Sequence, residues 1–212
     1  MPRFLVVLDV DSTLIENEVI ELLAEVKGTL SMVESITADA MNGLIDFESS
    51  LRSRVSTLQG LSSADLEAVG ARVQITAGVP EMIRAVHAAD GRVGVVSGGF
   101  HEVIDPIAEK LGLDYCRANR FEFDHDGRLT GLRGPIIDAG AKADTLREWA
   151  DEMGIPLSQT VAVGDGANDL RMMAICGLAV GFDAKAPVRD LANVIIDRRD
   201  MMQLLPLMGL RG

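Results

Sequence analysis

Residues 5–14 read LVVLDVDSTL, an apolar run that ends in two aspartates followed by a serine and a threonine. The run 4–8 has the length and the β-branched content of a strand buried on both faces, as in a parallel sheet. Ligands of open α/β sheets bind beyond the carboxyl ends of such strands. Residues two apart on an extended chain point to the same side, so Asp9 and Asp11 can reach one site while Val10 faces away. The sequence therefore predicts a carboxylate pair at a ligand-binding edge.

This pair needs partners before it indicates chemistry. Two like charges this close repel each other unless a cation or a proton lies between them. An ordinary solvated turn is the alternative, because Asp, Ser and Thr are common turn residues. A calcium-binding loop does not fit, since Leu14 stands where such a loop requires glycine and Ile20 where it requires a bidentate glutamate.

Composition limits the kinds of protein that this chain can be. Its 212 residues suit one domain or a core with an insertion, and 48% hydrophobic residues are enough to fill a core. The formal net charge of −12 argues against binding to nucleic acid or to anionic membranes, because no general basic patch is left to attract them. Cys116 and Cys176 are too few for a disulfide framework.

No targeting or membrane-spanning segment is expected. Only five consecutive apolar residues precede Asp9, which is too few for a signal peptide. The longest apolar stretch, 174–182, is too short to span a bilayer. We therefore expect a soluble cytoplasmic protein, with neither nucleic acid nor a membrane as a partner.

Strands and helices alternate along most of the chain. Strand-like runs lie at 4–8, 92–96, 114–117, 160–163, 178–182 and 194–196. Helical patterns lie at 80–89, 101–111, 142–153, 167–175 and 187–191. Pro80 and Pro187 suit the first turn of a helix, and Gly112 and Gly154 suit a helix end. The pattern predicts an α/β fold with a doubly wound, Rossmann-like parallel sheet.

One connection is far longer than an ordinary βα crossover. Residues 15–77 lie between the first strand and the helix before the second, and their apolar positions share helical faces. These faces are formed by Ile15, Val19, Leu22, Leu23 and Val26, and by Phe47, Leu51, Val55 and Leu58. We expect a core of residues 1–14 and 78–212 and a helical lid of residues 15–77 over the site. A helical subdomain without a gating role is the alternative.

A second, smaller insertion covers residues 120–134. It contains the segment FEF, the turn 124–127 of sequence DHDG, and a polar return strand, so it predicts a hairpin. The turn also resembles the start of a calcium loop, but no ligand-bearing continuation follows it.

Two further segments could bind phosphate. Ser97-Gly98-Gly99 follows the second strand and offers a hydroxyl and backbone N–H groups to a phosphate oxygen, although a plain turn would look the same. A nucleophile elbow is excluded there, because Val95 stands where that motif has glycine. Lys142 lies at the expected start of a helix, where the helix dipole disfavours a cation. This position indicates a phosphate-binding lysine or a lysine that separates carboxylates, unless the side chain is simply exposed.

The run 161–172, VAVGDGANDLRM, is more specific. A strand leads Asp165 into a glycine-flanked turn, and Asn168 and Asp169 begin the helix that follows. Helix capping explains one polar residue of this kind but not three. Hard oxygen ligands from Asp9, Asp11 and Asp165 would suit Mg²⁺.

The predicted lid carries two charged residues of interest. At about 100° per residue, Arg54 falls near the centre of the apolar face that begins at Phe47. Its stem could merely extend to the edge of that face, or its guanidinium could bind a substrate carboxylate. Glu18 and Glu25 both border the first helical face and could meet an ammonium group, and helical phase does not choose between them.

Together these segments resemble the haloacid dehalogenase superfamily of phosphohydrolases. Its four signatures appear in order as DVDST at 9–13, Ser97, Lys142 and GDGAND at 164–169. Within the superfamily, ENEVIELLA at 16–24, MNGLIDFESSLRSRV at 41–55 and VSGGF at 96–100 are similar to the phosphoserine phosphatase family. The resemblance implies a hydrolase that converts O-phospho-L-serine to L-serine and phosphate, as in serine biosynthesis.

The resemblance also implies a role for each matching residue. Asp9 would be the nucleophile that becomes an aspartyl phosphate, and Asp11 would protonate the leaving group and then activate water. Mg²⁺ would be held by Asp9, Asp165 and the backbone carbonyl of Asp11. The further implied site residues are Ser97, Gly98 and Lys142 at the phosphoryl oxygens, Glu18 at the substrate ammonium, Arg54 at its carboxylate, Asn168 and Asp169 beside the metal, and Met41, Phe47 and Gly99 as supporting residues.

Other functions remain open at this stage. A related phosphatase or phosphotransferase could act on another small monoester, such as phosphohomoserine or phosphoethanolamine. A binding protein without activity would not need the nucleophile.

Members of the family often carry an N-terminal regulatory domain, which we expect to be absent because the first strand begins at residue 4. The resemblance leaves a homodimer open.

Overall fold

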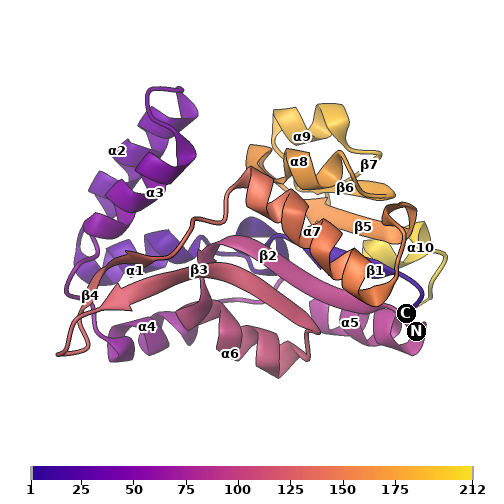
Figure 1. Ribbon diagram of the computed structural model, residues 1–212, viewed down its shortest axis with the longest axis horizontal. Helices are drawn as coiled ribbons and strands as arrows, with labels where there is room; N and C mark the ends of the chain where they lie inside the picture. Colours follow the sequence, from indigo (N-terminus) through magenta and orange to yellow (C-terminus); the bar gives the residue numbers. More distant parts are fainter. Residues whose placement is uncertain (1, 212) are drawn as a thin grey trace.

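The central strand of the fold is formed by the apolar run at the start of the chain. In the computed structural model, which describes residues 2–211, this run is β1 (Leu5–Leu8), and all four of its residues are buried. It pairs in parallel with β2 (Arg92–Phe100) on one side and with β5 (Thr160–Gly164) on the other. The whole sheet has the order β4-β3-β2-β1-β5-β6-β7 (Figure 1). Strand order therefore reverses at β1, the place where α/β sheets bind ligands beyond the strand ends.

Helices cover both faces of this sheet because successive β1 side chains point in opposite directions. Val6 and Leu8 belong to a core that includes residues of α5 (Val79–Ala88) and α6 (His101–Leu111). Leu5 and Val7 belong to a second core with residues of α7 (Ala139–Met153), α8 (Leu170–Met173) and α9 (Ala186–Leu191). The predicted doubly wound α/β class is thereby confirmed.

The edge strands also agree with the sequence pattern. β6 (Leu178–Phe182) and β7 (Val194–Ile196) have the predicted bounds and continue the parallel sheet. At the opposite edge, β3 (Tyr115–Phe123) is longer than predicted and pairs antiparallel with β4 (Leu129–Arg133). These two strands form the expected hairpin at residues 120–134.

Besides the end of β3, three further predicted boundaries differ from the structure. β2 does not stop at residue 96 but continues to Phe100, with a register irregularity between Val96 and Phe100 that accommodates the glycines. α7 begins at Ala139, three residues before Lys142, because the Asp138 side chain accepts a hydrogen bond from the Ala141 N–H and caps the helix. The helix predicted at 167–175 is a 3₁₀ turn, η3 (Ala167–Asp169), followed by the short α8.

The long connection after β1 contains four helices. A π-type turn, η1 (Val10–Leu14), leads into α1 (Val19–Lys27), α2 (Leu30–Met41), α3 (Phe47–Ser56) and α4 (Ser63–Gly70). α2 and α3 project away from the sheet, whereas α1 and α4 lie close to it (Figure 1). Where the chain enters and leaves this insertion, Ile15 and Ile75 form an antiparallel bridge.

The hairpin of β3 and β4 supports this insertion through backbone hydrogen bonds. Gly60 donates a backbone hydrogen bond to Leu129 of β4, and Leu129 donates one to Leu61. The remaining short elements are η2 (Leu157–Gln159), η4 (Met201–Gln203) and α10 (Leu204–Leu207). Among the described residues, no helix combines the length and hydrophobicity that crossing a bilayer requires.

Candidate active site

The carboxylate pair lies at the carboxyl end of β1. Asp9 donates its backbone N–H to the Val163 carbonyl of β5, and both aspartates have an extended backbone. Val10 is buried in the core, while Asp9 and Asp11 line one cavity. After them the chain turns sharply, because Ser12 has a left-handed backbone with φ of 57°.

A buried lysine neutralises part of this acidic site. Lys142 is completely buried, and its Nζ lies 2.7 Å from Asp9 Oδ1 and 2.8 Å from Asp169 Oδ1. Burial alone would lower the pKa of Lys142, but the carboxylates of Asp169 and Asp9 outweigh it and raise the pKa. The lysine therefore stays charged. Its place in the first turn of a helix, unfavourable by the dipole argument, is compensated by these two anions.

Three carboxylates gather close enough to share a metal ion. Oxygen atoms of Asp9, Asp165 and Asp169 all lie within 4.8 Å of one another, and all three residues are buried. Burial raises the pKa of Asp165 and of Asp169, and the nearby Asp9 raises both further. A cation among these oxygens would relieve the repulsion, so this set of hard donors fits a metal ion. The Asp11 side chain lies outside this set and accepts a hydrogen bond from the Val19 N–H at 3.0 Å.

The irregular end of β2 lies beside the aspartates. Ser97 is completely buried, and its hydroxyl accepts a hydrogen bond from the Gly99 N–H at 2.8 Å. A Cβ added at Gly99 would lie 3.2 Å from Asp11 Oδ2, and one added at Gly98 would lie 3.2 Å from the Phe47 ring. These glycines therefore allow the close approach of the strand to Asp11 and to the insertion.

The predicted site residues surround one cavity of about 590 Å³ between the strand ends and the insertion. Those that line it are Asp9, Asp11, Glu18, Met41, Phe47, Arg54, Gly98, Gly99, Asp165 and Asn168. Ser97, Lys142 and Asp169 are not among the lining residues and are buried. The structure therefore brings the predicted set together in two layers, an outer one in contact with the cavity and an inner one that supports it.

Charged residues of the insertion reach the same cavity. Glu18 accepts a hydrogen bond from the Ser12 hydroxyl at 2.8 Å, whereas Glu25 pairs with Arg72 at the surface. The structure therefore distinguishes the two glutamates that helical phase left equivalent. Arg54 Nε is buried, and no described residue accepts a hydrogen bond from it. Burial lowers the pKa of Arg54, so a bound anion would compensate a real desolvation cost.

Comparison with known proteins places this geometry in a family. The model of the haloacid dehalogenase-like hydrolases matches residues 6–174, which include the Asp9–Thr13 and Gly164–Asp169 signatures. The chain belongs to this hydrolase family. Membership confirms the resemblance drawn from the four signatures.

Several relatives of this haloacid dehalogenase-like hydrolase are phosphoserine phosphatases. The enzyme of Lactococcus lactis is 45% identical over 95% of this chain and 93% of its own length. The enzyme of Streptomyces coelicolor is 48% identical over 97% of this chain, which spans only 50% of that relative. Two solved phosphoserine phosphatase structures, a phospho-aspartyl intermediate analogue and a substrate-bound complex, are 41% and 40% identical, and each superposes with a TM-score of 0.91. Each alignment covers 98% of this chain and 99% of the solved chain.

Sequence reasoning missed several polar residues of the hydrolase site, among them Lys185 and Asn119. Lys185 lines the cavity, and its Nζ lies 2.9 Å from Asp165 Oδ2. Its signal was its position just after β6, at the same sheet edge as the other site residues. Asn119 donates to the Gly98 carbonyl at 2.8 Å and accepts from the Ile137 N–H at 2.9 Å, so it supports the irregular end of β2. No local pattern marked Asn119, because its partners are distant in sequence.

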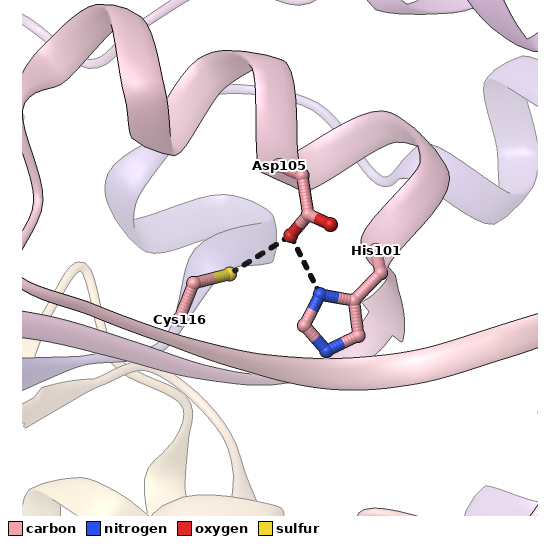
Figure 2. Close-up of side chains that lie close together, drawn as sticks. All are labelled: His101, Asp105 and Cys116. Atoms are coloured by element: carbon pink, nitrogen blue, oxygen red, sulfur yellow. Dashed lines mark hydrogen bonds and ion pairs between the residues drawn. The ribbon is translucent and has the colours of Figure 1, made fainter.

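A second group of potential metal ligands in this hydrolase, His101, Asp105 and Cys116, does not suit a metal (Figure 2). His101 Nε2 accepts a hydrogen bond from the Ala118 N–H, which leaves the proton on Nδ1, where it is donated to Asp105 Oδ1 at 2.6 Å. A metal bound to Nδ1 would displace that proton to Nε2, where it would face the Ala118 N–H, which is also a donor. Burial raises the pKa of Cys116 to about 12, so its thiol is protonated. These three residues instead form hydrogen bonds that join α6 to β3.

Proposed function

We propose that this hydrolase converts O-phospho-L-serine to L-serine and phosphate through an aspartyl phosphate on Asp9. One observation carries the proposal: a single cavity presents Asp9 and Asp11 together with Arg54 and Glu18. The first pair suits phosphoryl transfer, and the second suits the carboxylate and the ammonium of an amino acid. The names of the close relatives support the same substrate.

The contacts of Asp9 prepare it as the nucleophile. Lys142 Nζ lies 2.7 Å from its Oδ1 and places a cation beside the carboxylate, and Asn168 Nδ2 donates to its Oδ2 at 3.3 Å. When a carboxylate oxygen of Asp9 attacks phosphorus, a new P–O bond forms as the bond from phosphorus to the seryl oxygen breaks. The cation Lys142 stabilises the added charge on the phosphoryl group and its carboxylate partner.

Asp11 is suited to carry the proton. Burial raises its pKa well above the ordinary value, and the neighbouring Glu18 raises it further, so Asp11 can hold a proton for the leaving seryl oxygen. In the second half of the reaction the ionised Asp11 takes a proton from water as that water attacks phosphorus. The bond from phosphorus to Asp9 then breaks and phosphate leaves.

We propose Mg²⁺ as the metal, held by Asp9, Asp165 and the Asp11 carbonyl, with Asn168 and Asp169 beside it. The acidic oxygens around Asp9 fit such a hard cation. A bound Mg²⁺ would neutralise charge on the phosphoryl oxygens, and the Ser97 hydroxyl and the Gly98 N–H would donate hydrogen bonds to the same group.

The helical insertion, residues 15–77, is proposed as a lid over a core of residues 1–14 and 78–212. Met41 and Phe47 lie on the insertion side of the cavity, where closure would exclude water from the aspartyl phosphate. Met41 is 78% exposed, so it has surface to bury when the lid closes.

The substrate assignment is tested with Arg54→Met, because this change removes only the group assigned to the carboxylate. We expect kcat/KM for phosphoserine to fall by about tenfold to a thousandfold, the cost of losing a charged hydrogen-bonded pair. Turnover of phosphoethanolamine, which has no carboxylate, should change little. Release of phosphate from both substrates, with Mg²⁺ present, is the measurement.

Arg52→Met is the matched control, because Arg52 pairs with Glu48 on the exposed side of the same helix. It should leave both rates near wild type. An equal loss on both substrates in Arg54→Met would contradict the role of Arg54. Full phosphoserine turnover in Asp9→Asn would sink the proposed mechanism, and a preference for phosphohomoserine or phosphoethanolamine in wild type would favour the related-phosphatase alternative.

A further inference from the structure

Two strained turns lie at the carboxyl edge of the sheet near the candidate active site. Among residues 2–211, only Ser12, Asp90 and Asp183 are non-glycine residues with a left-handed backbone. Ser12 follows β1 and Asp183 follows β6, so both stand at the ligand-binding edge. Such conformations persist only when surrounding contacts hold them.

Both turns are held by one side chain, Arg199. Its Nη2 donates to the Ser12 carbonyl at 3.1 Å, and its Nη1 donates to Asp183 Oδ2 at 3.1 Å. Its Nε donates to the Glu16 carboxylate, and its guanidinium lies 5.5 Å from the centre of the Phe182 ring. A planar guanidinium with several fixed donors can serve three acceptors at once, which a single ammonium group cannot do with the same geometry.

Two of the three acceptors of Arg199, Ser12 and Glu16, belong to the segment that joins the catalytic turn to the insertion. Ser12 directly follows Asp11, and its hydroxyl donates to Glu18 at 2.8 Å. Glu16 lies where the chain enters the helical insertion, and its backbone N–H donates to the Gln74 carbonyl of the returning chain. Arg199 itself does not line the cavity, so it acts on the site only through these partners.

The neighbours of Arg199 attach to the same connection. Met201 donates its backbone N–H to the Ala77 carbonyl at 2.7 Å, where the chain returns from the insertion. A Cβ added at Gly78 would lie 2.6 Å from Asp200 Oδ1. The C-terminal segment therefore contacts both crossings between the sheet and the insertion.

We propose that Arg199 is a positioning residue that holds the catalytic turn, residues 9–13, and the entrance of the insertion in their working geometry. The assay of this role rests on the proposed phosphatase function, but the order of the turn does not. Loss of Arg199 removes the hydrogen bond to the Ser12 carbonyl and leaves the left-handed turn to the hydrogen bonds within its own segment, so the support shared by Asp11 and Glu18 weakens. Misplacement of catalytic groups by a fraction of an ångström to an ångström lowers rates strongly.

The test compares Arg199→Ala and Arg199→Lys with the matched control Arg189→Ala. Arg189 also forms an ion pair with a carboxylate, Asp197, but its hydrogen bonds go to Asp197 and not to Ser12 or Asp183. In Arg199→Ala we expect amide hydrogen exchange of residues 10–18 to accelerate by about tenfold or more, as for loss of hydrogen bonds to a charged group. Arg199→Lys should give a smaller acceleration, and Arg189→Ala none.

Activity supplies a second reading on two substrates. With phosphoserine and with p-nitrophenyl phosphate, Arg199→Ala should lower kcat by about tenfold to a hundredfold, and low-millimolar guanidinium ion should restore part of it. A variant with a merely lowered stability would not regain kcat from guanidinium. Unchanged exchange of residues 10–18 together with unchanged kcat would overturn the proposal, as would equal effects in Arg189→Ala.

Failure of the proposed function would look different. Wild type that hydrolyses p-nitrophenyl phosphate but not phosphoserine would refute the substrate and leave the Arg199 comparison intact. If Arg199→Ala does not fold, Arg199→Lys decides the outcome. Exchange rates and kcat equal to those of wild type in Arg199→Lys would contradict a need for the planar guanidinium group.

Discussion

At the scale of single residues, the candidate site depends on charge balance. Four carboxylates line its cavity, those of Asp9, Asp11, Glu18 and Asp165, on a chain with a formal net charge of −12. Charged groups out of water are stable only with close partners. Lys142 supplies the buried partner, and it touches Asp9 but not Asp11, which agrees with the different roles proposed for these two residues.

The removal of this lysine should therefore destabilise the protein as well as inactivate it. In Lys142→Met, Asp9 and Asp169 lose their common cation, which should cost about 3–5 kcal/mol of unfolding free energy. Adding Asp169→Asn should recover part of that stability without recovering turnover, because Asp9 still lacks its partner. Denaturant unfolding and phosphate release measure the two effects, and full stability in Lys142→Met alone would contradict the buried ion network.

The proton-carrying role proposed for Asp11 predicts a difference between leaving groups. The raised pKa of Asp11 provides a proton for a seryl oxygen, a poor leaving group, but p-nitrophenolate departs without one. Asp11→Asn should thus lose phosphoserine hydrolysis, yet release p-nitrophenol in a burst of about one equivalent before stalling at the aspartyl phosphate. Rapid-mixing absorbance follows the burst. Steady turnover of p-nitrophenyl phosphate at the wild-type rate would exclude Asp11 as the base of the second step.

At the scale of elements, helix α3 links stability of the insertion to binding. It carries both Phe47 and Arg54, and its N-terminus is capped by Asp46, whose Oδ1 accepts the Ser49 N–H at 2.9 Å. The hydrogen bonds from Ser49 lower the pKa of Asp46 below its ordinary value of 3.8. This carboxylate therefore stabilises the helix above that value, and the contribution disappears as pH falls through the lowered pKa.

Loss of this cap should loosen α3 and weaken substrate binding. We expect Asp46→Ala to accelerate amide exchange in α3 and to raise KM for phosphoserine several-fold at neutral pH, about the effect of one lost cap. Asn is an equally good capping residue without a charge, so Asp46→Asn is the control and should remain near wild type. On acidification, the protection of the α3 amides, measured against the intrinsic exchange rate at the same pH, should fall in wild type but not in Asp46→Asn. Parallel behaviour of the two variants would show that the cap does not matter.

At the scale of the whole molecule, the two ends of the sheet have different tasks. Site residues lie at the carboxyl ends of the strands, whereas close backbone contacts between neighbouring segments lie at the amino ends. Gly177 precedes β6 at that opposite end, and a Cβ there would lie 2.2 Å from the Ser158 carbonyl oxygen. Neither backbone can give way without moving a strand.

Substitution at this distant position should separate stability from activity. Gly177→Ala should destabilise the protein by about 1–3 kcal/mol through overpacking, while kcat of the folded enzyme stays unchanged. Gly70→Ala is the control, because a Cβ at Gly70 meets nothing within 4 Å. It should be neutral or slightly stabilising at the end of helix α4. Thermal unfolding and kcat are the measurements, and a lowered kcat in Gly177→Ala at full folding would contradict this separation of the two ends.

The sequence by itself determined the sheet and the outline of the site. The apolar run before Asp9 predicted the central strand, and β6 and β7 have the predicted bounds. Most of the predicted site residues do line one cavity. These predictions succeeded because strand length, the alternation of strands and helices and the spacing of the signatures are properties of residues that are close together in the sequence.

Only the tertiary structure decided which groups meet. It buried Lys142 between Asp9 and Asp169, placed Lys185 on Asp165, and joined Arg199 to Ser12 across the length of the chain. It also directed Glu18 to the cavity and Glu25 to the surface. Such pairs depend on the order of strands in the sheet and on the path of the long insertion. No local periodicity encodes that order, because it results from packing both faces of the sheet at once.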